Sequence, residues 1–352
     1  MIKRRKTKQI SIGNVKIGGD APISVQSMCN TPTEDIKSTL NQILELSDAG
    51  CEIIRLAVLN KDAAEGLKEI CKKSPIPVVA DIHFDYRLAI QAINNGVNAL
   101  RLNPGNIGKR ENVENVVNLA KQQNIPIRIG INAGSLEKKL KELDISLAEK
   151  MVKSAEGHMK IIQELDYDNI KVSLKSSDVP TTIEAYKLFS EKYDYPLHIG
   201  LTEAGTLKGG LVKSAVGIGT LLSQGIGDTI RVSLTENPIE EVYAGFSILK
   251  SLNLRKKGVN FISCPTCGRT QIKLIELAKK VEERFSNLDA DITIATMGCA
   301  VNGPGEASGA DFGIAGGVSE GYVFRKGEIV SRVKEESLID ELERVIKESL
   351  KM

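Results

Sequence analysis

The chain has 352 residues, a formal net charge of +2 at pH 7 and 26% charged residues, which is typical of a mixed, ordinary surface rather than a polyanion-binding one. Aromatic residues make up 4% with no tryptophan, so little is available for base stacking and nucleic acid is not an expected partner. No window approaches the roughly 18 apolar residues of a membrane span, and polar residues replace the apolar core of an export signal after the basic N-terminus. We therefore expect a cytoplasmic protein with no membrane partner.

A regular alternation of short β-rich runs and amphipathic helical stretches follows a hairpin predicted at QISIGNVKIGG. Eight successive β/α units in about 250 residues predict a closed (β/α)8 TIM-type barrel. An open doubly wound sheet is disfavoured because no run carries the strand-then-GxGxxG dinucleotide fingerprint. The helical stretches include 34–48, 61–72, 87–95, 111–123 and 238–251. The β runs begin at Ile23, Glu52, Pro77, Ala99, Ile127, Ile170, Leu197 and Thr229.

The pattern changes past Leu254, where the stretch 252–258 is the natural linker. Strand candidates VNFIS, DITIATM, DFGIAGG and YVFRKGEIVS then alternate with helical stretches at 271–285 and 334–351. We predict a barrel domain over 1–254 that binds the substrate and a smaller α+β domain over 255–352.

The strand ends of the predicted barrel, where such barrels place their active sites, are unusually basic. Converging cations repel one another unless a multiply charged ligand neutralises them, and a phosphate or diphosphate fits the forked donors of arginine. Some of these arginines can instead be structural, paired with Asp81 or Glu203. His83 and His198 are either proton carriers or hydrogen-bonded core residues. The set comprises Arg55, Arg101, Arg128, Lys175 and Arg231, with Asn103, Asn132, Ser173 and Ser233 among them.

Three cysteines lie in two short Gly/Pro-rich segments of the C-terminal domain, CPTCGRT and MGCAVNGPGEAS. A closed structural zinc site needs four Cys or His ligands, whereas a catalytic centre tolerates an exchangeable fourth ligand. Glu306 lies seven positions after Cys299 on a tight turn, and is either that ligand or a surface carboxylate. A CxxC pair alone also fits a redox dithiol or half a zinc knuckle, but a thioredoxin-type motif needs no third cysteine. The set favours a [4Fe–4S] cluster with one non-cysteine ligand.

The remaining cysteines, Cys29, Cys51 and Cys71, show no paired spacing. Six cysteines in 352 residues is not the density of a disulfide framework. We interpret the unpaired ones as intracellular thiols.

Long strings of the chain resemble bacterial 4-hydroxy-3-methylbut-2-enyl diphosphate synthases of the non-mevalonate isoprenoid route. They are FISCPTCGRT, MGCAVNGPGEASGADFGIAGG, RLNPGNIG, RIGINAGSL and LHIGLTEAG, and the similarity runs along essentially the whole chain. The resemblance implies reductive ring opening of 2-C-methyl-D-erythritol 2,4-cyclodiphosphate to (E)-4-hydroxy-3-methylbut-2-enyl diphosphate, with two electrons delivered through a [4Fe–4S] cluster. A weaker, fold-level similarity joins VQSMCNTPTED and AGCEIIRLAV to dihydropteroate-synthase-like barrels.

Carried over by position, this resemblance implies roles for individual residues. Cys264, Cys267, Cys299 and Glu306 would hold the cluster, and Glu203 is the acid/base candidate beside Glu306. Substrate would meet Arg55, Arg101, Arg128, Asn132, Lys175, Arg231, Ser233 and Asn302. The chain lacks a flavin or nicotinamide fingerprint, so a flavodoxin or ferredoxin is the implied electron donor. The family also implies a homodimer in which one subunit's cluster domain caps the partner's barrel.

Two other classes of function stay open at this point. One is a pterin-dependent or aldolase-like barrel transferase whose tail carries a structural zinc. The other is a cluster-bearing redox sensor or scaffold whose barrel binds a phosphorylated metabolite. Elemental analysis separates the reductase from the transferase, because the first requires about four irons per chain and the second one zinc.

Overall fold

The computed structural model describes residues 2–256, 258–286, 288, 290–299, 307, 309–317 and 320–352. The chain divides into two compact units, Met1–Arg255 and Lys256–Met352. Within the described residues, no helix combines the length and the apolarity needed to cross a membrane. Asn302 and Glu306, two of the predicted site residues, lie outside the described residues.

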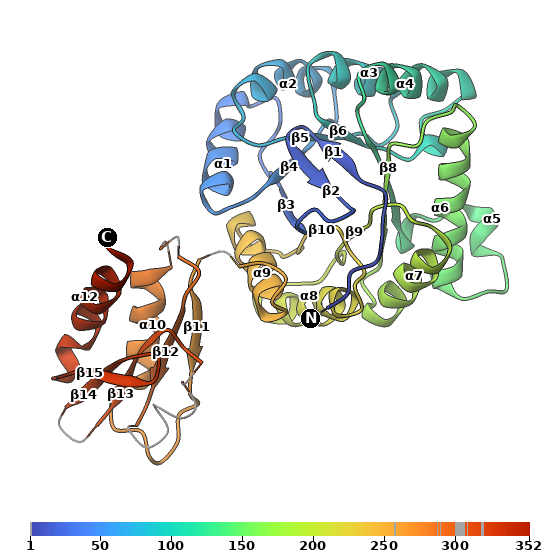
Figure 1. The fold of residues 1–352 in the computed structure, drawn as a ribbon. Coiled ribbons are helices and arrows are strands. Elements are labelled where there is room, and N and C mark those ends of the chain that lie inside the picture. The colour runs from blue at the N-terminus through green and yellow to red at the C-terminus, as the bar shows by residue number, and fades with distance from the viewer. Residues whose placement is uncertain are drawn as a thin grey trace. The chain divides into compact units, whose positions relative to one another are not determined.

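The first unit is a parallel barrel ringed by helices (Figure 1). Its strands pair in the order β8-β7-β6-β5-β4-β3-β10-β9, and a bridge between Val172 and Leu197 joins β8 to β9. The predicted (β/α)8 barrel is confirmed, and each strand starts within one residue of its predicted start. The strands are β3 (Ser24–Met28), β4 (Ile53–Ala57), β5 (Val78–Asp81), β6 (Ala99–Arg101), β7 (Ile127–Asn132), β8 (Ile170–Lys175), β9 (His198–Ile199) and β10 (Thr229–Ile230).

Helices cover the outside of the barrel, and polar caps define where several of them begin. Asp35 accepts a hydrogen bond from the Ser38 N–H at the start of α1, and Ser146 and Glu149 form a capping box at the start of α6. The helices are α1 (Ile36–Asp48), α2 (Lys61–Lys73), α3 (Tyr86–Asn94), α4 (Arg110–Gln122), α5 (Lys138–Lys141), α6 (Leu147–Gln163), α7 (Val179–Lys192), α8 (Leu207–Ser223) and α9 (Pro238–Ser251), with 3-10 turns η1 (Pro104–Asn106) and η2 (Ala133–Ser135).

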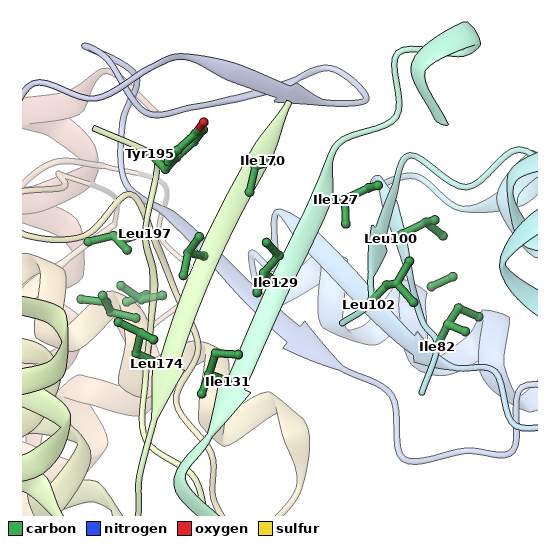
Figure 2. Close-up of a cluster of buried hydrophobic side chains, with 14 of the residues drawn as sticks. Ile82, Leu100, Leu102, Ile127, Ile129, Ile131, Ile170, Leu174, Tyr195 and Leu197 are labelled. Carbon is green, nitrogen blue, oxygen red and sulfur yellow. The ribbon is translucent and has the colours of Figure 1, made fainter. Parts of the chain in front are cut away.

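Side chains alternate along the barrel strands between an apolar outer layer and a polar interior. Ile127, Ile129 and Ile131 of β7 belong to the large hydrophobic core between strands and helices, and Figure 2 shows them beside Ile170 and Leu174 of β8. Because successive strand residues face opposite sides, the residues between them point into the barrel. The barrel interior therefore receives the charged and small residues of these strands.

The predicted N-terminal hairpin forms from β1 (Ile10–Ile12) and β2 (Val15–Ile17). Its isoleucines pack on Ile53, Val79 and Ala99, which stand at or next to the first residue of their strands. The hairpin therefore covers the N-terminal end of the barrel, and in Figure 1 it crosses the ring of strands. Among the described residues of this unit, the end at the strand C-termini is the one that the hairpin leaves uncovered.

The second unit contains a five-stranded mixed sheet with the strand order β11-β12-β13-β14-β15. Helices α10 and α12 pack on one face of this sheet, where Ile294, Ile314 and Val323 form a core with Leu277 and Leu342. Ala295, Met297, Ala315 and Phe324 form a separate cluster. The elements are β11 (Asn260–Ser263), α10 (Leu274–Phe285), β12 (Thr293–Met297), β13 (Phe312–Gly316), β14 (Gly321–Arg325), β15 (Glu328–Val333), η3 (Glu335–Ser337) and α12 (Leu338–Leu350).

The run YVFRKGEIVS, expected to form one strand, instead forms the hairpin of β14 and β15. Lys326 and Gly327 turn the chain with φ of +50° and +81°. Positive φ at both central residues is the geometry of a tight two-residue hairpin turn. The single-strand prediction was wrong because the Lys-Gly turn is embedded in an otherwise continuous β-prone run.

Candidate functional site

A cavity of about 100 Å³ lies at the C-terminal end of the barrel strands. The seven described barrel residues that were predicted to hold the substrate all line it: Arg55, Arg101, Arg128, Asn132, Lys175, Arg231 and Ser233. His83, Gly130, Ser173, Leu201 and Thr202 complete the lining. Residues from four strands, and from the segments that follow three others, thus converge on one polar space, as expected for the active end of a TIM-type barrel.

Arg128 departs from the expectation that each cation stands late in its strand. It is the second residue of β7, and it is 3% exposed. Its side chain lines the cavity and also a smaller void with Gln26 and Lys171. Arg128 therefore forms part of the cavity floor, reached by a long side chain from a lower layer of the barrel.

Two buried carboxylates balance part of the cationic charge of the cavity. Asp81 lies 3.3 Å from Arg55 and 3.4 Å from Arg101, while Glu241 on α9 lies 3.5 Å from Arg231. Five cationic side chains line the cavity, so the described residues leave a formal excess of three positive charges. Such an excess in a desolvated space is an anion-binding arrangement. The sequence did not single out Glu241, because its chemistry depends on contacts that only the fold creates.

Burial and mutual repulsion shift the pKa values of these groups. Desolvation lowers the pKa of Arg55 to about 10, against the attraction of Asp81. The Lys175 pKa falls well below its ordinary value, first by burial and then by repulsion from Arg128 and Arg231. Although burial acts in the opposite direction, the guanidinium of Arg55 and the hydrogen bond from His83 hold the pKa of Asp81 below its usual range. An incoming anion would relieve the repulsion among the cations.

The structure gives the two predicted histidines different surroundings. His83 lines the cavity, lies 3.3 Å from Asp81, and is within 3.4 Å of the Arg101 guanidinium. His198 is fully buried, and its Nδ1 lies 2.7 Å from the Thr229 hydroxyl. Of the two, only His83 has direct access to a ligand in the cavity.

Glu203, the acid/base candidate, is exposed and does not belong to the cavity lining, although its neighbour Thr202 does. Its backbone has φ of +54°, a left-handed conformation that is rare for residues other than glycine, asparagine and aspartate. Backbone strain of this kind clusters at ligand sites, so the position at the cavity edge is consistent with a functional residue.

Two of the three candidate cysteine ligands lie at the same end of the second unit's sheet, each directly after or near the end of a strand. The parallel strands β11 and β12 both end there, followed by Cys264 and by Gly298-Cys299. The Gly298 N–H donates to Cys264 Sγ at 3.1 Å, and the Gln271 N–H donates to the Gly298 carbonyl at 2.9 Å. The CPTCGRT turn is therefore held against the segment that carries Cys299.

Cys267, the third candidate, is exposed at the tip of the same turn. The backbone N–H of Arg269 lowers its pKa, and the side chain of Arg269 acts in the same direction. Hydrogen bonds and positive charge at a sulfur favour the thiolate that binds iron or zinc. Within the described residues, no three His, Cys, Asp or Glu side chains gather closely enough to hold a single metal ion.

Together these features define a two-domain enzyme with a TIM-type barrel that carries a cationic cavity and a small α+β unit that carries three cysteines. The GcpE TIM-barrel domain matches residues 7–246, and the GcpE protein C-terminal domain matches residues 260–348. The chain therefore belongs to the GcpE family, which confirms the predicted enzyme family.

Relatives of known activity are similar along nearly their whole length. The 4-hydroxy-3-methylbut-2-en-1-yl diphosphate synthase (flavodoxin) of Geobacter sulfurreducens is 59% identical, over 98% of this chain and 99% of that protein. The enzyme of the same name from Clostridium perfringens is 57% identical with the same coverage. Dihydropteroate synthase of Yersinia pestis shares the barrel fold alone, with a TM-score of 0.53 and 10% identity over 70% of this chain and 99% of that one.

Proposed function

We propose that this protein reduces 2-C-methyl-D-erythritol 2,4-cyclodiphosphate to 4-hydroxy-3-methylbut-2-enyl diphosphate. The observation that carries the proposal is the convergence of Arg55, Arg101, Arg128, Lys175 and Arg231 on one cavity, in a chain 59% identical to a synthase of that name. A cyclic diphosphate supplies the negative charge that this cavity lacks. The reaction opens the ring, releases one hydroxyl as water and consumes two electrons.

The barrel unit, residues 1–254, binds and orients the substrate in this proposal. Each guanidinium group donates two hydrogen bonds to diphosphate oxygens, and each charge-assisted contact stabilises the complex by about 1.5–3 kcal/mol. Asn132 and Ser233 offer neutral hydrogen bonds to the ring hydroxyls. Fixing the diphosphate holds the reacting carbons in one place, which is the positional part of catalysis. Glu203 at the cavity edge is the proposed proton donor, because the leaving hydroxyl departs as water.

The second unit, residues 255–352, holds a [4Fe–4S] cluster in this proposal, with Cys264, Cys267, Cys299 and Glu306 as ligands. Supporting observations are the Gly298 N–H bond to Cys264 Sγ and the lowered pKa of Cys267. When bound, such a cluster supplies single low-potential electrons, which amino-acid side chains cannot. Asn302, four positions before Glu306 in the chain, is the proposed substrate contact from this unit.

The electron donor and the assembly complete the proposal. The relatives are named as flavodoxin enzymes, so a flavodoxin is the proposed donor to this chain, with a ferredoxin as the alternative. We also propose a homodimer, in which the cluster unit of one subunit serves the barrel of its partner. The protein acts in the cytoplasm, where such donors are present.

The test is an anaerobic assay in which dithionite and a viologen dye reduce the protein in the presence of the cyclodiphosphate. Formation of 4-hydroxy-3-methylbut-2-enyl diphosphate, followed by mass, is the expected result. Elemental analysis of the same sample should find about four irons with matching sulfide per chain. One zinc with no iron would instead support the barrel transferase with a structural zinc tail.

A further inference from the structure

His158 lies on α6, on the outside of the barrel, and does not line the cavity. Its side chain is 5% exposed, and each of its two ring nitrogens makes a polar contact. The Gly105 N–H lies 3.1 Å from Nδ1, and a Glu137 carboxylate oxygen lies 3.2 Å from Nε2. A backbone N–H only donates, so Nδ1 accepts and Nε2 carries the proton that it donates to Glu137. The surroundings thus select one neutral tautomer of the imidazole.

The two partners of His158 belong to segments that leave neighbouring barrel strands. Gly105 lies in η1, directly after β6, and Glu137 lies after η2, which follows β7. Ser154, one turn earlier on α6, donates to the other oxygen of the Glu137 carboxylate at 2.8 Å. Side chains on one face of α6 therefore contact both the segment that follows β6 and the segment that follows β7.

The strands before these two segments carry residues that line the anion cavity. Asn103, two positions before Gly105, donates to the Gly130 carbonyl at 3.0 Å and accepts from the Gly130 N–H at 2.9 Å. The same carbonyl accepts from the Arg101 guanidinium at 3.0 Å. Arg101, Gly130 and Asn132 all line the cavity. Hydrogen bonds, joined by a short stretch of backbone between Gly105 and Asn103, therefore lead from the imidazole to the cavity wall.

The contact between His158 and the loop is also close in space. A Cβ atom added at Gly105 would stand 2.8 Å from the imidazole Cε1. The ring therefore packs against bare backbone, and the loop conformation depends on the position of the ring as well as on its acceptor nitrogen.

We propose that His158 is a positioning residue for the cavity. Its neutral ring holds the segments that follow β6 and β7, so that Arg101 and Asn132 are already placed for the ligand. Protonation of the ring releases Gly105 and weakens ligand binding. This inference rests on the proposed function only in requiring that the cavity binds a diphosphate. Protonation turns Nδ1 into a donor that faces the Gly105 N–H, which leaves both groups without an acceptor.

The charged groups around the ring oppose each other. Burial lowers the pKa of His158 most, Glu137 raises it, and the charges of Lys139 and Arg101 lower it again. The folded pKa thus lies below the ordinary value of 6.5. The ring is neutral, and able to support binding, when the pH is above the ordinary pKa. It loses this state as the pH falls through the lowered folded pKa.

Calorimetric binding of the cyclodiphosphate and of inorganic diphosphate to the anaerobically purified holoprotein tests the inference, over about pH 5.5 to 8. His158→Phe removes the acceptor nitrogen. The affinity for both ligands should fall about fivefold to twentyfold over the whole pH range, with an unchanged cluster spectrum. His158→Asn places an amide oxygen near the Nδ1 position and does not titrate. It should bind as the natural protein does at the upper pH and lose less affinity on acidification.

Parallel pH curves for the natural protein and His158→Asn would overturn the inference, as would unaltered binding by His158→Phe. If His158→Phe does not fold, the comparison of the natural protein with His158→Asn decides by itself, because both share every other titrating group. Binding of inorganic diphosphate without binding of the cyclodiphosphate would reject the proposed substrate and leave the test of His158 intact. A natural protein that binds neither ligand would reject both.

Discussion

Arg128 of β7 and Lys171 of β8 are cross-strand neighbours, paired in register inside the barrel, and both side chains are buried. Like charges directly opposite each other on a sheet are destabilising, and more so away from water. Burial, followed by the charge of Arg128, lowers the pKa of Lys171 well below its ordinary value, and Asp228 offsets this only in part. The barrel therefore buries a lysine next to Arg128 at a cost in stability.

Replacing Lys171 by methionine should stabilise the ligand-free protein. The unbranched apolar side chain keeps most of the volume and removes the desolvated charge, so we expect the free energy of unfolding to rise by about 1–4 kcal/mol at pH 7. Urea unfolding by circular dichroism measures the change. The lysine binds fewer protons in the folded state, so the natural protein gains stability as the pH rises toward the ordinary lysine value of 10.5.

The stability gap between Lys171→Met and the natural protein should therefore narrow between pH 7 and about pH 9.5. Lys171→Arg is the matched control, because it keeps the positive charge and should give no gain. A less stable Lys171→Met protein would show that the ammonium group makes a favourable interaction inside the barrel.

The sequence could predict the features that show in its local pattern. Alternating strands and helices predicted the barrel and the start of each strand, and basic residues in five β runs predicted the cations of one cavity. Lys171 was not singled out, because a lysine in a β run is normally solvated and only the closed barrel removes it from water. His158 was missed because its two partners, Gly105 and Glu137, come from separate segments that only the fold brings to it.

Removing the guanidinium of Arg128 should weaken ligand binding without unfolding the protein. Arg128→Ala deletes a guanidinium that lines the cavity and that we propose contacts the substrate, so we expect the affinity for the cyclodiphosphate to fall about 10-fold to 100-fold. Arg87→Ala is the control, because Arg87 is exposed and paired with Asp85 at the surface. Loss of the iron–sulfur absorption in Arg128→Ala alone would mean that the residue is structural, which calorimetry and the visible spectrum together reveal.

Neutralising Asp81 should destabilise the ligand-free barrel. Asp81→Asn leaves Arg55 and Arg101 without their shared counter-charge, so we expect a loss of about 3–5 kcal/mol in urea unfolding at pH 7. The folded pKa of Asp81 is depressed, so its contribution is present above the ordinary value of 3.8 and is lost as the pH falls through the depressed one. The variant should consequently show a flatter loss of stability in acid. Asp85→Asn, at the surface, is the control, and equal losses in both variants would exclude a special role for Asp81.

Cys299→Ser should remove the proposed cluster and the activity while the barrel stays folded. Cys299 follows the Gly298 N–H that donates to Cys264, so the substitution alters a ligand position and leaves the sheet edge intact. A serine hydroxyl is a harder and less acidic ligand than a thiolate, and it does not normally replace cysteine at iron. We expect iron content and visible absorption to fall to the level of the apoprotein, with unchanged far-ultraviolet circular dichroism. Cys71→Ser, on α2 of the barrel unit, is the matched control and should keep its iron. Full iron content and turnover in Cys299→Ser would reject the proposed ligand set, whereas loss in both variants would trace the defect to folding.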